Sequence, residues 1–413
     1  MKKLPSDIQK WNKRWGTEVV YCCPSSGGAV GIIFVWTGPV WSGGTKWDDE
    51  TQSSEAVSGY KFNEAAFVIK PIQGSAAPTK FAEHILTKIG GARSPHSVPI
   101  KRTTVNAQSL VNMLAKFRDK ETNPKIKQRW QAVFEHYRNA DVLLIQETQL
   151  GITELGDQYK PEAYSKAGGG LEKILTNQQL MINLGKLFAA DALIGNGDRL
   201  SNMNTGNVVF KNDGTISAID STTVLTSYQA ILNDQTATQL FTSDGSAFGP
   251  NHWIKDHALN SGNTQVMNAN QQNAAMSGRG LPTLAPGGGV SEIFDVKTWW
   301  TNKFKKDLEE GLRKHSPNET SPTGSIWFQA ELWFASGVNI GIQQIDSKLS
   351  GFNWLLMKNK YKSFISKFGG DPNLDWMNFK VRRKYIKLRK KGFSEEQTLK
   401  VLQDYIAKRM PGL

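Results

Sequence analysis

The apolar residues before position 195 recur with the spacing of one helical face. They stand at i, i+4, i+7 and i+8, and they are Leu180, Leu184, Leu187 and Phe188. Thr176 and Gln179 have the spacing of a capping box, which predicts the N-cap at Thr176. We expect the helix to run into a loop near Gly195.

Two short β-rich runs follow this loop, at residues 207–210 and 215–219. The Asn-Asp-Gly sequence at 212–214 is typical of a tight turn, so the two runs are predicted to form a β-hairpin. Asn207 and Asp220 stand at its two ends. Each carries a side-chain oxygen, the ligand atom that magnesium prefers.

The first 150 residues contain further apolar runs that predict a β-sheet. Strands are expected at residues 19–23, 30–36, 65–71 and 141–148. A polar insert, rich in Gly, Ser and Trp, occupies about 37–59. The turn between the first two strands holds Ser26, Gly27 and Gly28, which suits either a phosphate-covering loop or a simple turn.

Lys70 lies at the end of the third expected strand, where its ammonium needs an anion to offset poor solvation. The next segment, 79–90, predicts a helix whose Phe81, Ile85 and Ile89 share one face. Glu83 on this helix is the candidate anion. The alternative is that Glu83 is a solvated carboxylate and that Lys70 extends its ammonium to water.

Helical patterns return in the rest of the chain, at 105–140, 299–313 and 326–335, and in a last helix that opens at Ser394 with Gln397 completing a capping box. Residues 258–290 are polar and aperiodic, within an insertion of about 233–290, and this composition predicts a mobile segment. Residues 377–391 are strongly basic. They predict either a surface for an anionic membrane, an acidic protein or nucleic acid, or a solvated helix face.

The overall charge favours anionic partners. The 413 residues include 50 Lys and Arg against 37 Asp and Glu, a formal net charge of +13. The only cysteines, Cys22 and Cys23, are adjacent and cannot build a disulfide framework or a tetrahedral metal site. No apolar run of about 20 residues and no secretory signal is recognisable, so we expect a cytoplasmic protein, with signal-independent export left open.

The order Gly197-Asp198-Arg199, then Gly206-Asn207 with an apolar run, then Ile219-Asp220 resembles the protein-kinase-like superfamily. Within it, the chain is most similar to the actin-fragmin kinase group and the phosphatidylinositol 3-/4-kinase-like group. The resemblance covers about residues 19–221. It implies an α+β, two-lobed fold, with an antiparallel-sheet N-lobe at 1–150 and a mainly helical C-lobe at 151–413.

The resemblance also implies roles for particular residues in transferring the γ-phosphoryl group of ATP. Asp198 would be the catalytic base, and Arg199 would neutralise charge on the loop or the substrate. Asn207 and Asp220 would hold Mg²⁺. ATP would be bound by Ser26, Gly27, Gly28, Lys70, Glu83, Gln146 and Glu147, the last two at the hinge that reads adenine.

The chain departs from ordinary protein kinases in having Gly197 before Asp198 and Ser221 after Asp220. The two resemblances imply different acceptors, a protein hydroxyl for the actin-fragmin type and an inositol ring for the phosphatidylinositol type. The insert at 258–290 is polar and offers no apolar membrane-entry element, which favours a protein Ser or Thr hydroxyl. An actin-like target is implied by the resemblance only. Three alternatives stay open: a phosphatidylinositol kinase, a kinase-fold enzyme that adenylylates or glutamylates, and a non-catalytic basic binding module.

Overall fold

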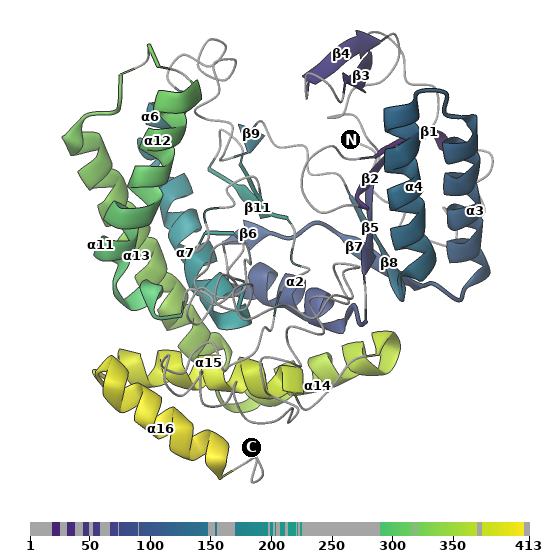
Figure 1. Cartoon of the computed structure of the whole chain (residues 1–413). Coiled ribbons are helices and arrows are strands. Elements are labelled where there is room, and N and C mark those ends of the chain that lie inside the picture. Colours follow the sequence, from purple (N-terminus) through teal and green to yellow (C-terminus); the bar gives the residue numbers. More distant parts are fainter. Residues whose placement is uncertain are drawn as a thin grey trace, which may run out of the picture. The chain divides into compact units, whose positions relative to one another are not determined.

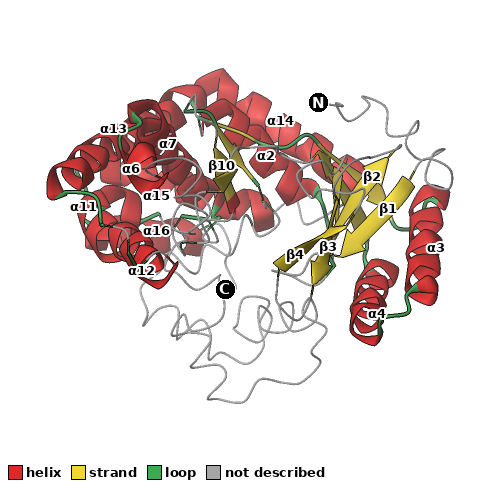
Figure 2. Cartoon of the chain, turned by 90° about the horizontal axis from the view of Figure 1, so that it is seen from above, coloured by secondary structure: helices red, strands yellow, loops and turns green. Residues whose placement is uncertain are grey.

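The protein has an α+β fold that is mostly helical, with small and largely antiparallel sheets (Figures 1 and 2). This computed structural model describes residues 19–24, 31–37, 44–48, 53–57, 67–72, 74–89, 91–147, 153–154, 170–196, 199–200, 203, 207–210, 214–219, 221, 224, 290–315, 317–318, 320–369 and 374–408. Within this part of the chain, no helix is long and apolar enough to cross a membrane.

The chain divides into two compact units. The first unit comprises Met1–Lys80, Pro95–Leu150 and Phe364–Gly370; the second comprises Phe81–Ser94, Gly151–Ser363 and Asp371–Leu413. Residues 81–94 belong to the second unit, where the Phe81 ring packs against Tyr361 and Phe379 with ring centroids 4.9 Å away in both cases. The predicted division into lobes at residue 150 stays a prediction.

A five-stranded antiparallel sheet forms the centre of the first unit. Its order is β1 (Val19–Pro24), β2 (Ile33–Thr37), β5 (Phe67–Ile72), β8 (Val142–Glu147) and β7 (Ser97–Lys101). The four strands expected from the sequence are therefore confirmed. Lys70 was expected at a strand end, which is wrong: β5 continues to Ile72, because Pro71 and Ile72 still pair with Leu143 and Val142 on β8.

Two helices, α3 (Val105–Lys120) and α4 (Pro124–Asn139), pack on this sheet, as both views show (Figures 1 and 2). The sequence predicted one helical stretch here. It is interrupted at Glu121, which is extended, and Pro124 then begins the second helix. Buried side chains from both elements form one core: Ile33, Ile69, Leu143 and Ile145 from the strands, and Leu110, Leu114, Trp130 and Tyr137 from the helices.

The polar insert of the first unit contains an element that the sequence analysis did not predict. Strands β3 (Gly44–Asp48) and β4 (Ser53–Val57) pair antiparallel as a separate two-stranded sheet. The apolar alternation that signals a half-buried strand is weak in both, which is why the sequence indicated only a polar insert here.

Helix α7 (Gln178–Ile194) is the central helix of the second unit, and it follows the short α6 (Gly170–Leu175). The predicted cap at Thr176 is wrong. Asn177 is the N-cap, and its side chain accepts a hydrogen bond from the Leu180 N–H at 3.0 Å. The Thr176 hydroxyl instead donates to the Glu172 carbonyl at 2.8 Å, within the preceding turn.

Helix α13 (Gly324–Lys348) packs closely along α7. The approach is possible because glycines face backbone at the contact: a Cβ on Gly185 would overlap the Phe334 carbonyl, and a Cβ on Gly337 would overlap the Ile182 carbonyl. Neither backbone can move without displacing a helix. The two glycines therefore set the distance between these helices.

Gly337→Ala is expected to destabilise the protein by about 1–3 kcal/mol, because the added methyl group overpacks a rigid backbone contact. Thermal or urea unfolding measures the effect. The matched control is Gly324→Ala at the start of the same helix, where a Cβ would meet nothing within 4 Å. Equal stability of the two variants would show that the close contact is absent in solution.

Other helices complete the second unit. They are α2 (Ala77–Ile89), whose first turn belongs to the first unit, η6 (Glu292–Phe294), α11 (Val296–Trp299), the π-helical η7 (Trp300–Lys305), α12 (Lys306–His315), α14 (Gly351–Phe368), whose last turn belongs to the first unit, α15 (Leu374–Lys390) and α16 (Glu395–Ala407). The capping box at Ser394 and Gln397 is confirmed. Phe81, Ile85 and Ile89 are buried together on α2, as predicted.

A small second sheet lies beside α7. Its strand order is β6 (Ala92–Arg93), β11 (Ile216–Ala218), β10 (Val208–Phe210) and β9 (Thr153–Glu154). Strands β10 and β11 pair antiparallel, with Val208 opposite Ala218, so the predicted hairpin is confirmed.

Candidate functional site

The loop that carries Asp198 begins where α7 ends, at Gly195. This residue has a left-handed φ of 70°, and a Cβ on it would lie 2.7 Å from Nε of Arg382. Glycine is thus needed both for the backbone conformation and for the approach of the arginine. Burial lowers the pKa of Arg382 to about 10, which leaves the side chain charged at neutral pH, and a cation is favoured beside a helix C-terminus.

Arg199 is the next residue of this loop that the structure describes after Asn196. Its side chain is fully buried, and Nη1 forms an ion pair with Oδ1 of Asp191 on α7. Nε donates to the Ile219 carbonyl at 3.0 Å, and Nη2 donates to the Ser221 hydroxyl at 2.6 Å. One guanidinium group therefore links the last turn of α7 to the chain just after β11.

These contacts involve the immediate sequence neighbours of Asp198, the candidate base, and of Asp220, the candidate metal ligand. Asp198 directly precedes Arg199, and Asp220 stands between Ile219 and Ser221, the two residues to which Arg199 donates. Asp198 and Asp220 themselves lie outside the described residues. Arg199 thus binds the residue before and the residue after Asp220.

Asn207 is buried at the open end of the hairpin. Its carbonyl accepts a hydrogen bond from the Ile219 N–H at 3.0 Å, so the two strands bring Asn207 beside the residue that precedes Asp220. An amide oxygen and a carboxylate are ligand types suited to Mg²⁺, which is usually bound by few protein oxygens and keeps other positions for phosphate or water. The residue types of Asn207 and Asp220 therefore fit a magnesium site, and a metal bound there stays a prediction.

In the first unit, Lys70 and Gln146 share one face of the five-stranded sheet. Ile69 and Ile145 point into the core beneath α3 and α4, so Lys70 and Gln146, one residue further along their strands, point to the opposite face. In the ladder Lys70 faces Leu144, two residues from Gln146. Both side chains are largely buried, at 8% and 5% exposure.

Further hydrogen bonds join polar groups next to Gln146 in the same unit. Nζ of Lys80 donates to the carbonyl and the hydroxyl of Ser97, at 2.8 and 2.9 Å, and Ser97 pairs with Gln146 in the ladder. The Glu147 carboxylate accepts from the His96 N–H at 3.1 Å. The Glu147 N–H donates to the His96 carbonyl at 3.0 Å, so this N–H is already used by the sheet.

The remaining candidates are placed as follows. Glu83 is buried on α2 in the second unit, whereas Lys70 belongs to the first, and their ion pair stays a prediction. Ser26, Gly27 and Gly28 lie outside the described residues. The hinge role of Gln146 and Glu147 likewise stays a prediction.

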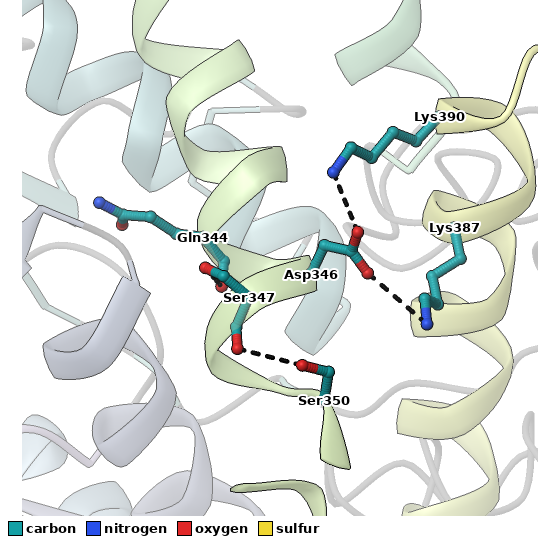
Figure 3. Close-up of polar contacts among 6 residues, drawn as sticks. All are labelled: Gln344, Asp346, Ser347, Ser350, Lys387 and Lys390. Atoms are coloured by element: carbon teal, nitrogen blue, oxygen red, sulfur yellow. Dashed lines mark hydrogen bonds and ion pairs between the residues drawn. The ribbon is translucent and has the colours of Figure 1, made fainter.

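The basic segment 377–391 lies mostly on α15, and most of its cations contact groups of the same chain. Asp346 at the end of α13 accepts a hydrogen bond from Lys390 at 3.0 Å and pairs with Lys387 at 3.6 Å (Figure 3). The bond from Lys390 lowers the pKa of Asp346. Arg383 and Lys384 lie over the rings of Trp354 and Tyr405, at 4.2 and 4.1 Å from the ring centroids.

The sequence analysis gave no role to two residues that contact Arg199, Asp191 and Ser221. Asp191 had a visible signal, since it stands within the apolar run Phe188-Ala-Ala-Asp-Ala-Leu-Ile194, and a carboxylate buried by such a run needs a charged partner. Ser221 had none, because a serine after a strand is common.

Comparison with protein-family models, with curated proteins and with solved structures finds no match for this chain. Its function is therefore inferred from the residues and their geometry.

Proposed function

We propose that the protein is an ATP- and magnesium-dependent phosphotransferase with a two-lobed, kinase-like architecture, and that it phosphorylates a Ser or Thr hydroxyl of a protein. The observation that carries the proposal is the contact set of Arg199. A fully buried cation is costly unless paired, and here it is used to order the chain beside Asp198 and on both sides of Asp220.

In the proposed reaction, Asp198 accepts the proton of the acceptor hydroxyl as its oxygen attacks the γ-phosphorus of ATP, and ADP leaves. Asn207 and Asp220 would hold Mg²⁺, which neutralises the phosphate charge when bound. Arg199 and Asp191 keep the loop and the strand end in register. Positioning of this kind is the main contribution a protein makes to phosphoryl transfer.

Lys70 supports the proposal from the first unit. It occupies a middle position of a central strand, on the sheet face opposite the helices, where a lysine contributes little to an apolar core. The proposal assigns its ammonium to the ATP phosphates, Glu83 to orienting it, and Gln146 and Glu147 to the adenine end. The sheet order β1-β2-β5-β8-β7 places the Lys70 strand directly beside the Gln146 strand.

Two labelled forms of ATP test the reaction class. The purified chain is incubated with cell lysate, and separately with phosphoinositide vesicles, with γ-labelled or α-labelled ATP and with or without Mg²⁺. Magnesium-dependent transfer of the γ-label alone to protein is the expected result. Transfer of the α-label would indicate adenylylation, γ-label only in lipid would indicate a lipid kinase, and no transfer to any acceptor would contradict the proposal.

Lys70→Ala is expected to weaken Mg-ATP binding roughly tenfold, because it removes a charge-assisted contact to phosphate. Titration calorimetry or a fluorescent ATP analogue measures the affinity. The control is Lys101→Ala, which removes an exposed lysine from the end of β7 in the same sheet. Unchanged affinity in a folded Lys70 variant would remove Lys70 from the nucleotide site.

A further inference from the structure

Helix α14 exposes an apolar surface in its N-terminal half, which belongs to the second unit. Phe352, Leu355 and Leu356 are 71%, 50% and 49% exposed, and their i, i+3 and i+4 spacing puts them on one face. Met357 and Tyr361 are buried on the opposite face of the same helix. The helix is thus apolar on two sides, of which only one is covered by the protein.

Positive charge lies next to this outer face, in the C-terminal half of the same helix. The sequence of α14 contains four lysines and no Asp or Glu. Lys360 and Lys362 are exposed, and the helical periodicity of 100° per residue places them on the two flanks of the apolar trio. The positive field extends to α2, since the pKa of His84 is lowered by burial and then by the charges of Lys88 and Lys360.

The two basic helices differ in the side chains that stand beside their lysines. On α15, Lys387 and Lys390 meet Asp346, and Arg389 meets Glu395 at 3.8 Å. On α14, the lysines accompany exposed Phe and Leu side chains on a helix that carries no acidic residue. Exposed large apolar residues flanked by lysines are the composition of a helix that lies in a membrane interface.

We propose that α14 docks the protein on an anionic lipid bilayer, with Phe352, Leu355 and Leu356 inserted among the acyl chains and the flanking lysines at the headgroups. The positive charge of α14 favours an anionic bilayer over a second copy of the chain as the binding partner. A second copy of the chain would bring lysines against lysines, whereas anionic headgroups attract each of them. This docking is independent of phosphoryl transfer.

Co-sedimentation of the full chain with vesicles tests the proposal without ATP. Binding is expected to vesicles that contain about one third phosphatidylserine, at least about tenfold tighter than to pure phosphatidylcholine. The triple variant Phe352→Ser/Leu355→Ser/Leu356→Ser should lose at least about tenfold in affinity. The control Phe328→Ser/Leu332→Ser, which removes an exposed apolar pair from α13, should bind as the parent does.

A second pair of variants tests separately how much the lysine charges contribute to vesicle binding. Lys360→Gln/Lys362→Gln should weaken binding to the anionic vesicles, and Lys297→Gln/Lys306→Gln, which removes two exposed lysines elsewhere in the second unit, should change it far less. Absence of vesicle binding, equal binding to neutral vesicles, or equal losses in the test and control variants would overturn the proposal. So would dimerisation that the triple variant abolishes, which would assign this face to a second copy.

Discussion

Asp198→Asn is expected to lower turnover by a factor of roughly 10² or more while leaving ATP affinity nearly unchanged. The substitution keeps the size of the side chain and removes its ability to accept a proton. If Asp198 acts only once the hydroxyl is attacking phosphorus, its loss affects the transition state and not the ground-state binding of nucleotide. Steady-state transfer of γ-label and an independent ATP titration measure the two quantities.

Asp220→Ala is the variant with which Asp198→Asn is compared. That change removes a proposed metal ligand, so it should abolish the part of ATP binding that depends on Mg²⁺. A neutral control is Asp404→Asn, an exposed carboxylate on α16. If the Asp198 and Asp220 variants lost binding and turnover in the same proportions, the assignment of one to chemistry and the other to metal would be wrong.

Local patterns in the sequence predicted much of the fold. The capping box at Ser394, the end of α7 at Gly195 and the hairpin around residues 212–214 depend on contacts between residues a few positions apart, so the sequence alone contains the information. The apolar run at its start also predicted the buried strand β8.

The errors arose where two local signals competed or where the deciding partner is distant in sequence. Thr176 and Asn177 are both good caps, and the first is used to close α6. Helix α14 was not predicted, since it lacks a single apolar stripe: apolar residues stand on both its covered and its exposed sides. The partner of Arg199, eight residues earlier on α7, could be found only by asking what neutralises Asp191.

The buried pair of Asp191 and Arg199 should be important for both stability and turnover, and a double-variant cycle separates the two effects. Asp191→Leu leaves the guanidinium buried without its counterion, and such removal costs about 3–5 kcal/mol. Chemical unfolding measures the loss. Arg138→Met, which breaks the exposed Arg138–Glu135 pair at 3.7 Å, is the control and should cost less than about 1 kcal/mol.

Adding Arg199→Met to Asp191→Leu removes both charges and fills the space with apolar groups, so much of the lost stability should return. Turnover should not return with it, because a methionine side chain in place of Arg199 cannot donate to the Ile219 carbonyl and the Ser221 hydroxyl on either side of Asp220. A stable double variant with low turnover would identify Arg199 as a residue that positions the site. A stable double variant with full turnover would reduce the pair to a structural feature of α7, and the geometry around Asp220 would then have to be maintained by other contacts.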